Sequence, residues 1–348
     1  MRTRNAKWLS NSGGFTLVEL LISMTVFLIA IGAVFAAAQL ATVQRSVVNS
    51  RLDQIRSGRI ALEYLRRDAI NAGLGYHRTG GNAPDDFARG LFAMKYDVDT
   101  ERDLMTAIMA GNEINTNNRN FTEMTDEVAF VSRDLSFNNG LLVNYTSATA
   151  SGSSVRINTV SGGTANCRQY DVYLFESSSG TTQVIGTATS VPNTSSILLA
   201  PGSADPLGLN QAANGTGEAL SMLMSSTGGG TIKRVNIVSY GVTPKGVLVR
   251  KTYGNKPGSS ASEQIETREL VYNVSGFQIR YFMEDGTTVD DPALDNSGRE
   301  NQIKMNSVVQ IQVTITIAGD PTASSSVARS PVSLNEFIST KNLRYESS

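Results

Sequence analysis

The sequence predicts an α+β fold, in which one long N-terminal helix packs on a C-terminal head made of antiparallel β-sheet. Two observations predict it. The first is an apolar run, Leu20 to Ala38, that continues into a helical pattern with a single apolar stripe. The second is the last third of the chain, where short segments of alternating apolar and polar residues are separated by turns. The chain has 348 residues, enough for one large domain or two modest ones.

The apolar run has the length and composition of a membrane-spanning helix. Only Ser23 and Thr25 within it are polar, and about 20 apolar residues cross a bilayer. Three basic residues precede it, so the positive-inside rule predicts a cytoplasmic N-terminus and a far-side location for everything beyond the run. An alternative is a secretory signal cut near Ala36 to Ala38, although such signals usually have a shorter apolar region.

Glu19 is the residue that a simple membrane anchor does not explain. It lies at the start of the apolar run, and a charged side chain at mid-bilayer costs about 2.5–3.5 kcal/mol, less near the interface. Two interpretations follow from this position alone. Either the carboxylate reaches back to the lipid headgroups, or it has a partner or a function.

The residues around Glu19 favour the second interpretation. The segment Gly14-Phe15-Thr16-Leu17-Val18-Glu19, with its short basic leader, resembles the prepilin processing motif of type IV pilins and type II secretion pseudopilins. The resemblance implies that a prepilin peptidase cuts between Gly14 and Phe15 and that the new Phe15 amine is methylated. It also implies that Glu19 pairs with the N-terminal amine of a neighbouring subunit in a fibre, where an opposite charge makes a buried carboxylate tolerable.

The helical pattern becomes amphipathic after the apolar run and indicates one face that packs on the head. Four apolar residues recur at intervals of seven and two lie beside them. A stop is expected at Asn71-Ala72-Gly73, because glycine readily adopts the left-handed conformation past a helix end. The stripe consists of Val48, Leu52, Ile55, Leu62, Leu65 and Ala69.

These boundaries and the resemblance together divide the chain into four segments. They are a leader peptide (1–14), the transmembrane and assembly half of the helix (15–41), its amphipathic half (42–72) and a periplasmic or extracellular β-rich head (73–348).

Strands are expected in the head wherever apolar and polar residues alternate between clusters of Ser, Gly and Asn. Residues 73–125 are interpreted instead as a long surface excursion with a short helix near Asp103 to Met109, and residues 201–230 as a flexible loop. The expected strands are Glu127–Ser132, Leu141–Tyr145, Ser154–Val160, Tyr170–Glu176, Gln183–Thr189, Ile232–Val242, Val247–Tyr253, Ile265–Val274, Phe277–Glu284 and Val308–Ala318.

Two further segments narrow the resemblance. Ser57 to Tyr76 is similar to the helix end of PilW-type minor pilins. The hairpin reaching Leu248-Val249-Arg250, the run LVYNVSGFQIRYF and the closing alternating strand resemble the C-terminal body shared by PilW-type and J-type pseudopilin subunits. The resemblance therefore implies a minor pilin, a structural subunit that helps to initiate or prime assembly of a type IV pilus.

The implied partners are prepilin peptidase, other minor and major pilins, and the pilus assembly platform in the inner membrane. The implied location is the inner membrane, with a single pass, and then the fibre at the cell surface. Two alternatives remain: a type II secretion minor pseudopilin, or a membrane-tethered periplasmic binding module or hydrolase that never polymerises.

No pattern in the sequence predicts an enzyme, a cofactor or a metal. Cys167 is the only cysteine and His77 the only histidine, so a disulfide within the chain and a multi-histidine site are excluded. No activating motif surrounds either residue of a Cys167–His77 dyad. The net charge of -1 gives no sign of nucleic-acid binding. Two acidic runs offer oxygens to calcium without completing a binding loop: Asp97, Asp99 and Glu101, and Asp285, Asp290, Asp291 and Asp295.

Overall fold

The computed structural model describes most of the chain, which divides into two units, Met1–Asp53 and Gln54–Ser348. Gly14, the acidic run at 97–101, and Asp291 and Asp295 lie outside the described residues. The described ranges are 15–94, 102–116, 124–210, 218–225, 228–290, 303–319, 330–340 and 342.

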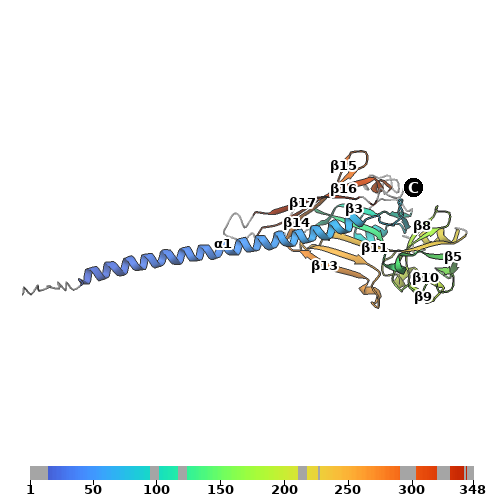
Figure 1. Ribbon diagram of the computed structural model, residues 1–348, viewed down its shortest axis with the longest axis horizontal. Coiled ribbons are helices and arrows are strands. Elements are labelled where there is room, and N and C mark those ends of the chain that lie inside the picture. The colour runs from blue at the N-terminus through green and yellow to red at the C-terminus, as the bar shows by residue number, and fades with distance from the viewer. Residues whose placement is uncertain are drawn as a thin grey trace, which may run out of the picture. The chain divides into compact units, whose positions relative to one another are not determined.

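Helix α1 (Leu17–Asn71) begins in the first unit and ends in the second (Figure 1). All residues from 15 to 46 are exposed. So large an apolar surface is unfavourable in water, because apolar groups gain free energy when they leave it. By length and composition α1 is a candidate membrane span, and none of its most apolar window is buried.

The second-unit part of α1 is buried along one face. Ala61, Leu62, Leu65 and Ala69 are at most 5% exposed and belong to the main hydrophobic core. The helix ends as expected, because Gly73 has a φ of 79° and its N–H donates to the Val131 carbonyl at 2.9 Å. This left-handed residue turns the chain towards the sheet.

The body of the head consists of two antiparallel groups of strands that share this main core. The first has the order β3-β4-β11-β12-β13 and the second β15-β14-β16-β17. Gly58 of α1 faces Leu334 and Ile317 of the second group, where an added Cβ would clash with Leu334 Cδ1. The bounds are β3 (Ile108–Thr116), β4 (Met124–Arg133), β11 (Gly230–Val242), β12 (Leu248–Tyr253), β13 (Ile265–Val271), β14 (Val274–Met283), β15 (Thr288–Val289), β16 (Val308–Ile317) and β17 (Val332–Ser339).

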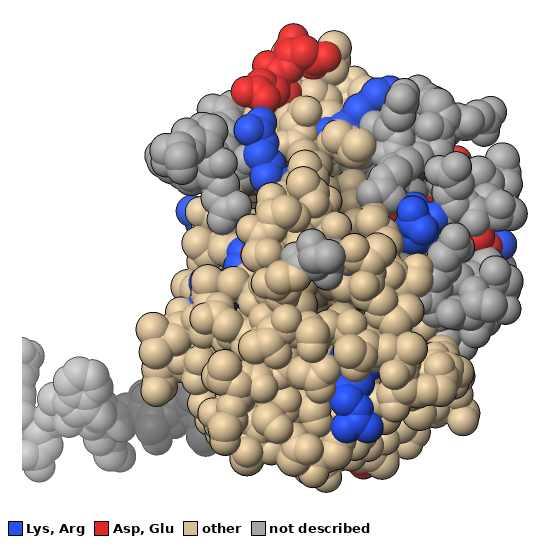
Figure 2. Space-filling model, turned by 90° about the vertical axis from the view of Figure 1, so that its right-hand side faces the viewer, with Lys and Arg blue, Asp and Glu red and all other residues tan. Residues whose placement is uncertain are grey.

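A second core, the outer core, is formed by the segment inserted between β4 and β11. Few of the described side chains on the face shown in Figure 2 are charged. Residues 135–232, which include most of the inserted segment, contain no lysine. The outer core includes Phe137, Tyr145, Tyr173, Phe175, Ile197, Leu220 and Leu223. Its elements are η1 (Phe137–Gly140), β5 (Val143–Ser151), β6 (Ser154–Thr159), β7 (Val172–Ser177), β8 (Gln183–Thr187), β9 (Ser190–Asn193), β10 (Ser196–Leu199), η2 (Gly202–Ala204) and α3 (Glu218–Ser225). Two further short helices are η3 (Ala261–Glu263) and η4 (Met305–Ser307).

Strand β11 belongs to both cores. Its residues Gly230–Ile232 pair with β5, and Val235–Gly241 pair with β4. Arg234 lies between these stretches and donates to Asp134 Oδ2 at 2.7 Å and to Asp171 Oδ2 at 3.2 Å. Burial raises the pKa of Asp171, against the effect of these donors. The charged pairs thus join the two cores where the strand changes partners.

The predicted α+β fold, with a long apolar N-terminal helix followed by antiparallel sheet, is confirmed. Among the described residues one strand pair is parallel, β1 (Gly81–Ala83) with β8. The ten expected strands all overlap observed ones. The strands that were not expected are β1, β2 (Asp103–Met105), β3, β9, β10, β15 and β17.

The surface excursion expected over residues 73–125 is wrong for its described part. That part holds β1 (Gly81–Ala83), α2 (Phe87–Phe92), β2 (Asp103–Met105) and β3, with Phe92 and Ile108 buried. The helix expected near Asp103 to Met109 is also wrong, because strands occupy it. All three residues of β2 are buried, so no alternation is left in the sequence to mark a strand.

The flexible loop expected over residues 201–230 is wrong in its described part. Helix α3 lies there and buries Leu220 and Leu223 in the outer core. These residues are three apart and face one side of a helix. The surrounding Gly, Ser and Asn residues hide this short pattern in the sequence.

Candidate assembly segment and helix–head interface

Thr16 and Glu19 start helix α1 as a reciprocal pair. The Glu19 backbone N–H donates to Thr16 Oγ1 at 3.3 Å, and the Thr16 backbone N–H donates to Glu19 Oε2 at 3.3 Å. This arrangement is a capping box, which satisfies backbone N–H groups that have no partner within the helix. The carboxylate also lies at the positive end of the helix dipole. Glu19 is thus accommodated locally, by an exposed and weak set of hydrogen bonds.

The two polar residues of the apolar run bond to the helix backbone. Ser23 Oγ donates to the Glu19 carbonyl at 2.7 Å, and Thr25 Oγ1 donates to the Ile22 carbonyl at 2.8 Å. Internal hydrogen bonds remove much of the cost of placing a hydroxyl in a lipid or protein interior. The run can therefore leave water without an unpaired polar side chain.

Asp68 joins the other end of α1 to the sheet. Its Oδ2 accepts from Arg250 Nε at 2.7 Å and from the Tyr240 hydroxyl at 2.6 Å. The Asp68 and Arg250 side chains are 11% and 17% exposed. Burial acts against the charge of Arg250, but the hydrogen bond and charge of Asp68 outweigh it and raise the Arg250 pKa.

Contacts on both flanks of α1 complete the helix–head interface. On one flank the guanidinium carbons of Arg67 and of Arg268 in β13 lie over the Tyr64 ring, 5.2 Å and 4.8 Å from its centroid. On the other, Arg66 Nε lies 3.7 Å from Glu336 of β17. Cation–π and exposed ionic contacts are individually weak, so the buried stripe and Asp68 carry most of the attachment.

A comparison with known families identifies the segment at the start of α1. The family described as the prokaryotic N-terminal methylation motif matches residues 9–35. The chain carries this methylation motif. A search of curated proteins gives no match.

The methylation motif indicates a pilin- or pseudopilin-type subunit of type IV pili or type II secretion, and proteins with this motif are structural subunits rather than enzymes. Its match covers Gly14, Phe15 and Glu19 and most of the apolar run. Motif and candidate span together indicate membrane anchoring.

The structure places the residues of the predicted stripe in two groups. Val48 and Leu52 lie in the first unit and are 55% and 43% exposed. Ile55 is half-buried, and the remaining three are in the main core: Leu62, Leu65 and Ala69. Within the methylation motif, Phe15 is 79% exposed and Glu19 is exposed as well, while Gly14 lies outside the described residues.

Sequence reasoning missed Thr16 and Asp68. The spacing Thr-x-x-Glu before an apolar run is a capping-box signal and could have identified Thr16. No local signal could have identified Asp68, because its partner Arg250 is 182 residues away.

His77 and Cys167, the two residues of the dyad considered above, have different neighbours in the structure. The His77 ring lies 2.9 Å from Thr79 Oγ1 and 4.0 Å from a Glu176 oxygen. Cys167 is buried beside Tyr173, and burial raises the pKa of its thiol to about 11. Over the described ranges, no group of three or more His, Cys, Asp or Glu side chains is arranged to hold a metal ion.

Proposed function

We propose that this chain is a minor pilin of the PilW type, which helps to initiate or prime a type IV pilus. The observation that carries the proposal is a single helix, α1, with two environments. Its start carries the methylation motif and an exposed apolar surface, and its end is packed in a β-sheet head. Such a helix suits a subunit that is first held in a membrane and then packs against other helices in a fibre.

Processing creates the assembly end in this proposal. Prepilin peptidase cuts between Gly14 and Phe15, which removes the basic leader, and the new Phe15 amine is methylated. Glu19 then lies four residues from a positive N-terminus, about one helical turn. Among the described residues, the Glu19 carboxylate contacts only Thr16, through exposed capping bonds, so little is lost when it changes partners.

Inside the fibre Glu19 pairs with the N-terminal amine of a neighbouring subunit. A carboxylate in an apolar environment is costly alone, and an opposite charge at contact distance offsets that cost. The N-terminus faces the cytoplasm before assembly and the head faces the periplasm. The partners are prepilin peptidase, other minor and major pilins, and the assembly platform of the inner membrane.

A type II secretion minor pseudopilin is the second candidate, because the methylation motif belongs to both systems. Rescue of a deletion strain separates the two. A minor pilin restores surface fibres, whereas a pseudopilin restores protein secretion and leaves fibre number unchanged.

The first experiment tests cleavage in the native host. Trp8 is the only tryptophan and lies in the leader, so the mature protein should lack indole fluorescence and begin at Phe15. Gly14→Val should block cleavage, because the peptidase must fit an extended backbone with no side chain, and mass spectrometry should then find Met1 to Gly14. Gly13→Val is the matched control and should still be cut. A wild-type chain that keeps its leader, or is cut near Ala38, contradicts the proposal.

The second experiment separates the two roles of Glu19. Glu19→Ala should leave membrane levels and cleavage normal but abolish incorporation into sheared fibres. Thr16→Val removes the capping hydroxyl and keeps the carboxylate, so it should still assemble. Equal loss in both variants would assign Glu19 to helix capping, and full function of Glu19→Ala would favour a tethered module that never polymerises.

A further inference from the structure

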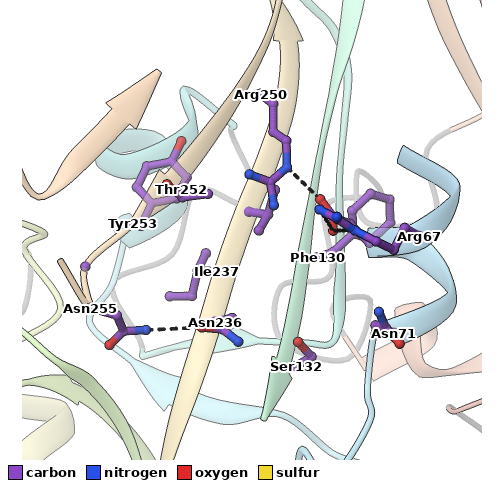
Figure 3. A pocket seen from close by; sticks show the side chains of 13 residues that line it. Arg67, Asn71, Phe130, Ser132, Asn236, Ile237, Arg250, Thr252, Tyr253 and Asn255 are labelled. Carbon is purple, nitrogen blue, oxygen red and sulfur yellow. Dashed lines mark hydrogen bonds and ion pairs between the residues drawn. The ribbon is translucent and has the colours of Figure 1, made fainter. Parts of the chain in front are cut away.

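A pocket of about 280 Å³ opens in the second unit, beside the end of α1 (Figure 3). It exists because the helix ends at Asn71 while strands β4, β11 and β12 continue past that point. Their register places Ser132 opposite Asn236, and Phe130 opposite Val238, on one face of the sheet. The next pair along is Val238 with Thr252. The floor is therefore sheet surface that α1 does not cover.

The wall of the pocket carries a net positive charge. Asp68 is shared by Arg250, with its Nε at 2.7 Å, and Arg67, with its Nε at 3.3 Å. Among the described residues that line the pocket, two guanidinium groups and one carboxylate leave one positive charge uncompensated. The Nη atoms of Arg250 have no hydrogen-bond partner among the described residues, and its side chain is only 17% exposed. A partly desolvated guanidinium with free donors attracts an acceptor-only group.

The remaining polar groups of the pocket are neutral. The side chains of Asn71, Ser132 and Thr252 line it and make no side-chain hydrogen bond in the described part of the chain. Asn236 Oδ1 accepts from Asn255 Nδ2 at 3.5 Å, and the Asn236 Nδ2 group makes no hydrogen bond within the described residues. Each of these amides and hydroxyls can donate a hydrogen bond. The ligand that satisfies most of them at once offers several acceptor positions and no donors.

We propose that this pocket binds a carboxylate group, held by the free guanidinium donors of Arg250 and Arg67 and by the Asn71 amide. An ionised carboxylate is acceptor-only, and its two oxygens match the guanidinium fork. Its single negative charge equals the uncompensated charge of the wall, whereas a phosphate group brings about −1.5 to −2 at pH 7. The carboxylate comes from an acidic side chain of a partner protein or from a free organic acid.

The test uses the full-length chain in detergent and two probes. One is the blocked tripeptide acetyl-Gly-Glu-Gly-amide and the other is glutarate, and titration calorimetry measures the binding of each. Binding of the Glu peptide, and none of its Gln counterpart, assigns the carboxylate to a partner protein. Binding of glutarate alone assigns it to a free acid. Absence of binding by both probes overturns the proposal.

Three variants locate the bound carboxylate. Arg67→Gln should weaken binding at least tenfold, and Asn71→Asp should weaken it further because it adds a negative charge at the rim. Arg66→Gln removes the same charge one residue away, where the side chain contacts Glu336 instead of the pocket, and should leave binding unchanged. Equal weakening by Arg66→Gln and Arg67→Gln would mean nonspecific attraction and overturn the site. Thermal unfolding of each variant checks that the fold is intact.

Discussion

The two halves of helix α1 share one backbone but occupy opposite environments. From Leu17 to Ala38 apolar side chains surround the helix, and all are exposed. From Gln54 to Asn71 most of them form a buried stripe, whereas Ile60 and Ile70 are exposed on the faces that also carry charge. The difference shows that apolar content alone does not identify a helix's partner. A helix that is apolar all round is made for lipid or other helices, and a striped one for a single sheet.

The largest effect is expected in the striped half. Leu62→Asp places an unpaired charge where the side chain is 5% exposed, so it should destabilise the head by about 3–5 kcal/mol. Denaturant unfolding of the full chain in detergent, followed by circular dichroism, measures this. Ile60→Asp is the control, because Ile60 is 57% exposed on the same turn. If the two variants unfold at the same midpoint, the stripe does not attach the helix to the head.

In the apolar half, a substitution by aspartate should affect membrane insertion and not the stability of the head. Val34→Asp lies within the exposed apolar run and should leave the unfolding midpoint of the head unchanged. It should oppose membrane insertion by about 2.5–3.5 kcal/mol. Carbonate extraction of membranes, compared with wild type, measures the inserted fraction. A lowered head stability would show that the two halves are not independent.

A smaller effect is expected where α1 is joined to the sheet by charge. Asp68→Asn keeps the shape but weakens the bonds from Arg250 and Tyr240, so about 2 kcal/mol of stability should be lost, as is typical for hydrogen bonds to charged groups. Asp86→Asn is a matched control, since the Asp86–Arg89 pair is exposed. Equal midpoints for both variants in denaturant would assign the attachment to apolar packing alone.

The smallest effect concerns the flank of the helix. Arg66 is 53% exposed and its distance to Glu336 is 3.7 Å, so Arg66→Gln should change stability by less than about 0.5 kcal/mol. Unfolding at low and at high salt checks this, because screening should remove the remaining difference. A loss as large as that of Asp68→Asn would mean that the β17 flank, rather than the stripe, holds the helix.

The sequence predicted strands that have one buried face and one more exposed face. β16 was predicted from the alternation of Val309, Ile311, Val313, Ile315 and Ile317, although the buried set is Ile311, Val313, Ile315 and Ile317 together with Val308. β2 is buried on both faces and shows no alternation. β17 was missed because its exposed positions include Phe337, which is 55% exposed and pairs with Phe282.

The functional residues also divide into those that the sequence predicts and those that depend on the tertiary fold. Gly14, Phe15 and Glu19 lie within six consecutive residues, and the family match covers them. The pocket beside Asn71 depends on where α1 ends relative to β4, β11 and β12, and that register is set by tertiary packing. Local spacing carries no information about it.

The continuity of β11 has a mechanical consequence. The same strand pairs with β5 and β7 at one end and with β4 and β12 at the other, and Arg234 is the last residue that pairs with β7. A pull on the outer core along this strand would load its hydrogen bonds to β4 and β12 together, in shear, and not one after another. The inserted segment is therefore positioned to transmit tension into the body without first peeling away from it.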